Sequence, residues 1–347
     1  MNAAHATVFL TASVLALLFS YPLRKAAGRF NLVDEPRERT IHRKAVPTLG
    51  GVAIWASFFL ALAFGALLPG GRILASEKVK GLFYGGTIVL LLGLYDDVRA
   101  ARVWLKMCVQ AGAALVLVGF DYRIRLVASP IGGAVDLGLF GIPLTIIWVI
   151  GVVNAVNLID GLDGLAAGIC AIAGISLFAT GFPLGFGFSS LLAAGVVGSA
   201  LGFLKHNFHP ARIFMGDTGS MFLGFCLSAV SLAGAGKSVA MVALLIPIIA
   251  LGLPILDTLL AVIRRTRKRV NIFQSDKEHI HHKLLELGLS HRGVVLFLYG
   301  VSVLFGALAV GLATADRRIV AAIVIVVVIV TASGGFRVRR FRRDSSR

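Results

Sequence analysis

The chain is long, apolar and basic, and this combination excludes most soluble proteins. Of its 347 residues 57% are hydrophobic and only 15% are charged, and the formal net charge at pH 7 is +17. A soluble α/β protein of this length would need polar faces for which the sequence has no room. Several apolar runs reach the roughly 20 residues that a helix needs to cross a bilayer. The composition therefore predicts an all-α polytopic membrane protein, built as one integral-membrane domain over residues 1–347.

About eleven transmembrane helices are predicted in chain order. The predicted spans are residues 6–22, 49–69, 81–94, 103–120, 142–157, 164–180, 187–204, 218–234, 239–263, 294–314 and 318–333. The ninth span contains Pro247 and Pro254, so a kinked or broken helix is expected there. The loop at 121–141 alternates in part between apolar and polar residues, which predicts a short hairpin. The first apolar run lacks a basic n-region, which argues against a cleavable signal peptide.

The basic residues are distributed unevenly between the two sides of the predicted bundle. Most of the 34 Lys and Arg residues lie in alternate loops and in the tail at 335–347. The positive-inside rule places these segments in the cytoplasm, with the N-terminus outside and the C-terminus inside. The basic excess is then mostly topological. Membrane lipids with anionic headgroups are its expected partner, and nucleic acid is not.

Four polar clusters interrupt the apolar sequence, and all four fall on the predicted cytoplasmic side. They are LYDD with Asp96 and Asp97, NAVNLIDGLDGLAAG at 154–168, KHNFHPARIFMGDTGS at 205–220, and SDKEHIHHKL at 275–284. Polar loop residues without a functional role would seldom all lie on one face of the membrane. The clusters therefore predict a single functional site.

The cluster at 154–168 ends one predicted span and opens the next. Asn154 and Asn157 are expected on the last turns of the fifth span, with Asp160 and Asp163 in a turn that the neighbouring glycines permit. A hydrogen-bonded contact between helices is the alternative interpretation. Placing two carboxylates at membrane depth costs free energy, and such residues are usually functional, which favours a functional role here.

The acidic residues of the other clusters each have two interpretations. Asp217 stands between glycines where the eighth span begins, and Thr218 and Ser220 are expected to cap this helix. Asp217 is either an ordinary acidic first turn or a ligand that holds Mg²⁺ against a phosphate at the helix N-terminus. The adjacent Asp96 and Asp97 repel each other unless a divalent ion or one raised pKa relieves them, although acidic span ends that meet water are equally common.

The histidine cluster and one further aspartate complete the candidates. His279, His281 and His282 lack an evident fourth zinc ligand, and the lysines beside them favour an anion-binding loop. Asp257 lies in an apolar run about two turns before Arg264. It is either a structural partner of a nearby arginine or part of the site.

Taken together, these motifs resemble the polyprenyl-phosphate N-acetylhexosamine-1-phosphate transferases. This family includes the phospho-MurNAc-pentapeptide translocase and the undecaprenyl-phosphate GlcNAc-1-phosphate transferases. The similarity covers nearly the whole chain. In order, the matching motifs are PRERTIHRKAVPTLGG at 36–51, LYDD, NAVNLIDGLDGLAAG, FMGDTGSMFLG, and HIHHKLLELGLSHR at 279–292.

The resemblance implies a role for individual residues. It implies a metal-binding role for Asp217, a catalytic role for Asp96, Asp97, Asn157, Asp160, His279, His281 and His282, and a nucleotide-binding role for Lys44, Asp163, Asn207 and Phe214. The histidine motif is expected to contact the diphosphate or the sugar, and Phe214 to stack on uracil. Ala100 stands where the family often has a third aspartate, so a role for a third carboxylate is left unsupported.

The resemblance also implies an activity. It is the Mg²⁺-dependent transfer of a sugar-1-phosphate, with Mn²⁺ as an alternative ion, from a UDP-N-acetylhexosamine to polyprenyl phosphate, with release of UMP. The HIHH motif and the eleventh span favour GlcNAc-1-phosphate over phospho-MurNAc-pentapeptide, which is the alternative. A more distant alternative is an ion-coupled transporter, because intramembrane carboxylates and broken helices also mark transporters.

The resemblance places the enzyme in a biological setting as well. It implies the inner membrane of a bacterium, an active site facing the cytoplasm, and a role in starting cell-envelope glycan synthesis, such as that of teichoic acid or lipopolysaccharide. The sugar, the polyprenol length, the base within the pair at 96–97 and the oligomeric state stay open, a homodimer being one option.

Overall fold

The computed structural model describes residues 3–30, 32–34, 45–128, 134–235, 246–268 and 279–314, which are mostly helical. The α-helices are α1 (Ala3–Arg29), α2 (Gly50–Ala66), α3 (Glu77–Arg99), α4 (Val103–Gly119), α5 (Gly141–Ile159), α6 (Leu165–Gly181), α7 (Gly187–Asn207), α8 (Gly216–Ala235), α10 (Gly252–Arg267), α11 (Ile280–Glu286) and α12 (His291–Thr314). Two short 3₁₀ helices, Arg72–Ala75 and Gly138–Phe140, precede α3 and α5.

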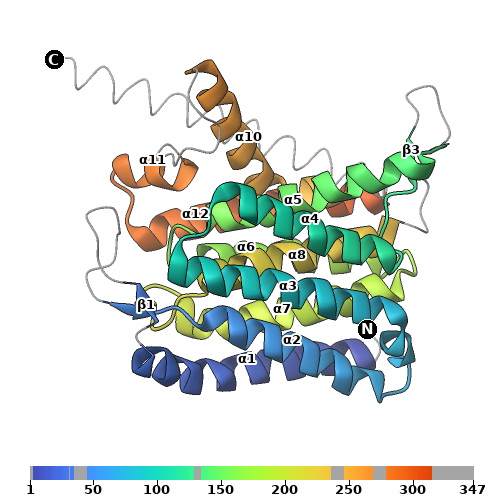
Figure 1. Cartoon of the computed structure of the whole chain (residues 1–347), viewed down its shortest axis with the longest axis horizontal. Coiled ribbons are helices and arrows are strands. Elements are labelled where there is room, and N and C mark those ends of the chain that lie inside the picture. Colours follow the sequence, from blue (N-terminus) through green and yellow to red (C-terminus); the bar gives the residue numbers. More distant parts are fainter. Residues whose placement is uncertain are drawn as a thin grey trace.

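The long helices pack side by side in a single bundle (Figure 1). Most residues of α6, α7 and α8 are buried, so these helices form its interior. They are rich in glycine, alanine and serine, which let helix backbones approach closely in membrane proteins. In contrast, α10 projects out of the bundle at an angle, and the short α11 lies beside it (Figure 1).

The helices have the length and surface of a membrane protein. Five of those described, α1, α3, α5, α7 and α12, are long and apolar enough to cross a bilayer, and α2, α4 and α6 are shorter apolar helices. Large apolar side chains such as Leu18, Leu91 and Phe297 are exposed on the outer helices. Large exposed apolar side chains on several outer helices agree with an apolar, lipid environment. The expected all-α membrane protein is confirmed at this level.

The predicted spans agree with the observed helices wherever the structure describes them. The first eight spans coincide with α1 to α8 and the tenth with α12. In the ninth, residues 246–250 are helical, Leu251 forms a turn, and α10 starts at Gly252. The break predicted from Pro247 and Pro254 is therefore present. The eleventh span at 318–333 and the tail at 335–347 lie outside the described residues, so the number of spans stays a prediction.

Two pairs of short strands occupy opposite ends of the bundle (Figure 1). Strand β1 (Val33–Asp34) pairs antiparallel with β2 (Val46–Pro47). Strand β3 (Leu126–Ala128) pairs antiparallel with β4 (Ala134–Asp136), as the hairpin prediction for this loop requires. The first pair lies at the end of the bundle that carries α11.

The start of α8 is held at backbone contact with two neighbouring helices. A Cβ atom at Gly51 of α2 would collide with the backbone of Thr218 and Gly219, and one at Gly93 of α3 with the backbone of Thr218. Side chains at these two positions would push the helices apart. Glycine here therefore fixes the position of the first turn of α8, which carries Asp217.

Candidate active site

A cleft of about 560 Å³ opens at the end of the bundle that carries β1 and α11. This volume lies within the roughly 300–1,000 Å³ typical of small-molecule sites. Among the predicted site residues, those lining it are Asp96, Asp97, Asp160, Asp163, Asn207, Phe214, Asp217 and His282. Residues from all four polar clusters thus meet in one place. Lys44 lies outside the described residues, and Ala100 lines the cleft without a polar side chain.

Asp217 is held from both sides by hydrogen bonds. The Asn157 side-chain amide donates to Asp217 Oδ1 at 2.9 Å and to the Ser220 hydroxyl at 3.0 Å. The Lys106 ammonium donates to Asp217 Oδ2 at 3.1 Å and also forms an ion pair with Asp96. Each carboxylate oxygen of Asp217 therefore has a fixed partner, which orients the carboxylate toward the cleft.

Lys106 is a site residue that the sequence reasoning missed. It lies on α4, in the apolar run VWLKMCVQ, and its ammonium joins the carboxylates of α3 and α8. The available signal was the lysine itself, because an ionisable residue inside an apolar helix is expensive unless it has a partner.

Asp97 caps α8 from a neighbouring helix. It accepts hydrogen bonds from the backbone N–H of Asp217 at 2.7 Å, from the backbone N–H of Thr218 at 3.2 Å and from the Thr218 hydroxyl at 2.6 Å. The first N–H groups of a helix have no partner inside it, and a carboxylate is well suited to satisfy them. The prediction that Thr218 and Ser220 cap this helix is wrong, since Thr218 donates to Asp97 and the Ser220 hydroxyl bonds back to the Gly216 carbonyl at 3.1 Å.

Within the described part of the chain, the carboxylate of Asp160, unlike those of Asp97 and Asp217, is not held by hydrogen bonds. It follows the last residue of α5, lines the cleft, and its carboxylate has no hydrogen-bonded partner among the described residues. Burial raises the pKa of Asp160 well above its usual value, and the charges of Asp217, Asp97 and Asp163 raise it further. Asp160 thus differs from Asp96, Asp97 and Asp217, whose carboxylates all have hydrogen-bonded or ion-paired partners, and it keeps free acceptor atoms and an unrelieved electrostatic cost.

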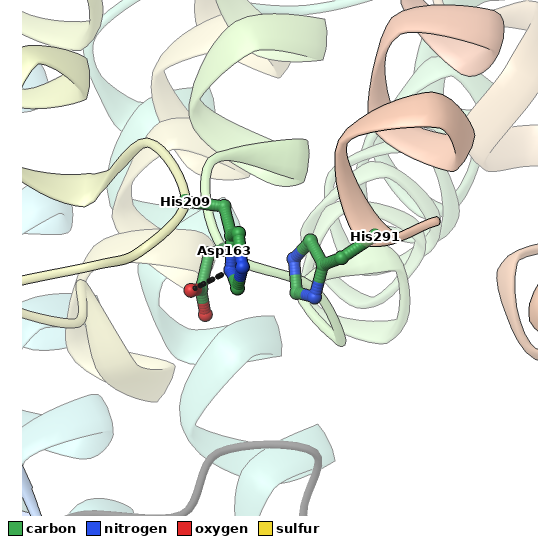
Figure 2. Close-up of side chains that lie close together, drawn as sticks. All are labelled: Asp163, His209 and His291. Carbon is green, nitrogen blue, oxygen red and sulfur yellow. Dashed lines mark hydrogen bonds and ion pairs between the residues drawn. The ribbon is translucent and has the colours of Figure 1, made fainter. Parts of the chain in front are cut away.

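Asp163 binds the segment that follows α7, as Figure 2 shows. Its Oδ2 atom lies 2.7 Å from His209 Nδ1 and accepts the backbone N–H of Ala211 at 3.0 Å. The His209 ring stacks on His291, with centroids 4.0 Å apart and an angle of 19° between the planes.

The donor atoms of Asp163, His209 and His291 lie within 4.8 Å of one another, a distance range that also occurs in metal sites. The lone pairs of imidazole nitrogens lie in the ring plane, so two stacked rings direct them side by side and not toward one ion. We therefore describe this group as a hydrogen-bonded stack in the wall of the cleft.

Asn207 fastens two site segments together. It is 3% exposed, its Oδ1 accepts the backbone N–H of Gly164 at 3.1 Å, and its amide donates to the Ile213 carbonyl at 3.0 Å. Gly164 has a φ of +80°, a conformation that favours glycine. Asn207 thus joins the turn after α5 to the segment that carries Phe214, whose backbone N–H donates to the Pro47 carbonyl at 2.8 Å.

The histidine cluster approaches the cleft from the side of α11. His282 lines the cleft, whereas His279 and His281 are buried behind it. The His281 ring packs against Gly161, where a Cβ atom would collide with it. Burial lowers the pKa of His281 to about 4, with smaller contributions from His282 and His279, so His281 is neutral at pH 7. Among the described residues Asp257 pairs with His279 and with no arginine, so the interpretation as an arginine's partner is not supported there.

Comparison with known proteins supports one family. The sequence profile described as glycosyl transferase family 4 matches residues 79–235. A probable undecaprenyl-phosphate N-acetylglucosaminyl 1-phosphate transferase of Bacillus subtilis is 37% identical over 307 residues, covering 87% of this chain and 84% of that protein. A decaprenyl-phosphate N-acetylglucosaminephosphotransferase of Mycolicibacterium smegmatis is 35% identical over 333 residues, covering 89% and 81%.

A third relative represents the other branch. A phospho-N-acetylmuramoyl-pentapeptide-transferase of Shouchella clausii is 31% identical over 323 residues, covering 87% of this chain and 94% of that protein. The relatives span most of the chain, and their names agree with the resemblance carried by the motifs. The chain therefore belongs to the polyprenyl-phosphate N-acetylhexosamine-1-phosphate transferases of glycosyl transferase family 4.

Proposed function

We propose that this protein transfers N-acetylglucosamine-1-phosphate from UDP-N-acetylglucosamine to a polyprenyl phosphate and releases UMP. The observation that carries the proposal is the cleft in which Lys106 and Asn157 orient Asp217 beside the free carboxylate of Asp160. The choice of sugar is supported by the Bacillus subtilis and Mycolicibacterium smegmatis relatives named for N-acetylglucosamine, which are 37% and 35% identical to this chain, whereas the Shouchella clausii relative named for the muramoyl pentapeptide is 31% identical.

The cleft has the donor atoms that Mg²⁺ prefers. Six aspartates and one lysine line it among the described residues. Magnesium takes oxygen ligands, commonly one or two carboxylates together with substrate phosphates. Burial raises the pKa of Asp160, the neighbouring aspartates raise it further, and a divalent cation beside it would oppose both effects by stabilising the ionised carboxylate. Asp217 would hold the ion with Asp160 beside it, and the bound ion would neutralise charge on the diphosphate.

The reaction exchanges one pyrophosphate bond for another. An oxygen of the lipid phosphate attacks the β-phosphorus of the UDP-sugar in line, the bond to the UMP oxygen breaks, and UMP leaves with the bonding electrons. Catalysis of this kind consists mainly of positioning and charge neutralisation. The second pKa of a phosphate is about 6, so the acceptor is mostly ionised at pH 7 and needs little help from a base.

The two carboxylates of the acidic pair then have different tasks. Asp97 holds the first turn of α8 and so keeps Asp217 in place. Asp96 forms an ion pair with Lys106, and its Oδ1 accepts the backbone N–H of Ala101 at 2.7 Å. We assign Asp96 to the placement of the Lys106 ammonium, which can also contact a substrate phosphate.

We further propose that the cleft faces the cytoplasm of a bacterium across its inner membrane, where it starts the synthesis of a cell-envelope glycan. Lys205 and Arg212 are exposed beside the cleft end of the bundle. Basic residues at that end agree with the positive-inside rule.

The test is a transferase assay with purified protein. The protein is incubated with undecaprenyl phosphate, Mg²⁺ and, in turn, UDP-N-acetylglucosamine, UDP-N-acetylgalactosamine and UDP-MurNAc-pentapeptide, and UMP release is measured. We expect release with UDP-N-acetylglucosamine. Asp217→Asn should remove most of this activity and weaken its Mg²⁺ dependence, whereas the control Asp136→Asn, an exposed residue at the opposite end, should not.

Two other results would overturn the proposal. Turnover of the muramoyl pentapeptide donor alone would assign the protein to the other branch. Uptake of a UDP-sugar into proteoliposomes without UMP release would indicate a transporter.

A further inference from the structure

One carboxylate joins the protruding helix α10 to the short helix α11. Asp257 on α10 is 2% exposed and His279, directly before α11, is 5% exposed. Asp257 Oδ2 lies 2.8 Å from His279 Nδ1, and Asp257 Oδ1 accepts the backbone N–H of Ile280 at 3.0 Å. His279 is the N-cap residue of α11, yet its own side chain makes no capping hydrogen bond. Asp257 supplies that acceptor from another helix, as Asp97 does for α8.

This arrangement determines which nitrogen of His279 carries a proton. The backbone N–H of Ile280 can only donate, and an ionised carboxylate can only accept. The Asp257 oxygen that faces the ring therefore requires a hydrogen on Nδ1. In the neutral imidazole the lone pair is then on Nε2, so the carboxylate selects one tautomer.

The same contact sets the orientation of the whole histidine cluster. The rings of His279 and His281 are nearly parallel, at 7°, with centroids 5.9 Å apart. The centroid of His281 is 4.3 Å from that of His282, which lines the cleft, and the His281 ring packs against Gly161 in the turn beside Asp160. A displacement of His279 would therefore be passed through His281 to the wall of the cleft.

We propose that Asp257 is a positioning residue. It fixes His279 as the Nδ1–H tautomer and holds α11 so that the histidine cluster meets the cleft in one orientation. The consequence for turnover rests on the proposed transferase function, whereas the tautomer and the helix contact do not.

The substitution Asp257→Asn tests the tautomer directly. The side chains have nearly the same shape, but asparagine has only one acceptor oxygen. The fixed N–H of Ile280 takes that oxygen, so the amide NH₂ faces His279 Nδ1 and requires the Nε2–H tautomer. Nitrogen NMR of histidine-labelled protein in detergent, at about pH 9 and so above the ordinary histidine pKa of about 6.5, reports the tautomer. His279→Gln identifies its signals.

We expect the His279 signals to change from the Nδ1–H to the Nε2–H pattern in Asp257→Asn. They should stay unchanged in Thr258→Ala, a control on the same turn of α10 whose hydroxyl donates to the Pro254 carbonyl at 2.9 Å. An Nε2–H pattern in the unmodified protein, or no change in Asp257→Asn, would overturn the proposal.

Kinetics distinguish positioning from a general loss of stability. In a serine protease triad the same inversion of a tautomer lowers kcat about 10⁴-fold, so we expect Asp257→Asn to lower kcat at least about 100-fold, with little change in KM for the UDP-sugar. In a His279→Ala background the same substitution should cause no further loss. Losses that multiply independently in the double variant would show that Asp257 does not act through His279. If the unmodified protein shows no transfer at all, the proposed function fails while the NMR result still decides the tautomer.

Discussion

The substitution Asp97→Asn separates a capping role from a chemical role within the acidic pair. Asp97 lies on the exposed mouth of the cleft but accepts three hydrogen bonds from the first turn of α8. Asparagine retains one acceptor oxygen. The Thr218 hydroxyl can rotate to accept from the new NH₂ group, but the backbone N–H groups of Asp217 and Thr218 cannot both keep their partner.

The expected loss in the free energy of unfolding follows from the number of hydrogen bonds that asparagine can no longer accept. Removing a helix cap typically costs about 0.5–2 kcal/mol. Thr218 is fully buried, so an unpaired N–H there adds a desolvation cost of about 1–3 kcal/mol when no water reaches it. Because the oxygen of asparagine still satisfies one of the two N–H groups, we expect the free energy of unfolding to fall by about 1–3 kcal/mol in total.

The assay combines thermal unfolding in detergent with transferase kinetics across a Mg²⁺ titration. Asp97→Asn should lower the melting temperature and raise the Mg²⁺ concentration needed for half-maximal activity, since Asp217 loses its fixed position. At saturating Mg²⁺, kcat should stay within about tenfold of normal, which is a barrier change of about 1.4 kcal/mol. If the variant instead melts at the normal temperature and has lost almost all turnover, Asp97 acts in the chemistry and the capping argument is wrong.

Three further predictions concern pH and topology. Burial and the neighbouring aspartates raise the pKa of Asp160, so its protonated form stabilises the fold, and this stability is lost as the pH rises above the ordinary aspartate pKa of about 4. The variant Asp160→Asn should therefore have a melting temperature no lower than normal at pH 7 but should lose most activity. A clear drop in melting temperature would contradict this. Burial lowers the pKa of His281 to about 4, so its contribution to stability is complete above a pH of about 6.5 and is lost as the pH falls toward about 4. In His281→Gln the melting temperature should therefore depend less on pH in that window than in the unmodified protein. The same dependence in both proteins would refute the assignment. In a Cys108→Ala background, a cysteine introduced at Ser76 should react with an impermeant thiol reagent in intact cells and one at Lys205 should not, and the reverse pattern would invert the proposed topology.

The hydrophobic pattern was sufficient to locate the long helices α1 to α8 and α12, and the turn between α5 and α6, whereas it did not predict α11. Helix α5 ends at Ile159, where the apolar run gives way to the polar cluster, and Asp160 and Asp163 lie in the turn that the glycines predicted. Asn157 lies on the last turn of α5, as expected, and bonds Asp217. Asn154 instead bonds Gln110 of α4 at 2.6 Å, which is the contact between helices that the alternative interpretation described.

The partners of the polar side chains were beyond local sequence patterns. The hydroxyl of Thr218 reaches Asp97 across 121 residues, and Lys106 reaches Asp217 across 111. Spacing arguments describe neighbours on one helix, whereas these contacts depend on which helices pack together. For this reason the sequence predicted a common site but assigned the cap of α8 to the wrong residues and overlooked Lys106.

The charge of the cleft has a consequence for the order in which substrates bind. The described residues lining it include six aspartates against one lysine, yet both substrates of the proposed reaction carry phosphates. Over the part of the cleft that these residues form, a free nucleotide sugar therefore approaches a surface of its own sign. Repulsion extends farther at low ionic strength, with a screening length of about 30 Å at 0.01 M salt against about 10 Å at 0.1 M. Without a divalent cation, dilution of salt should thus weaken binding of the UDP-sugar, which is opposite to the behaviour of most phosphate-binding proteins. The cation should bind before the nucleotide or together with it.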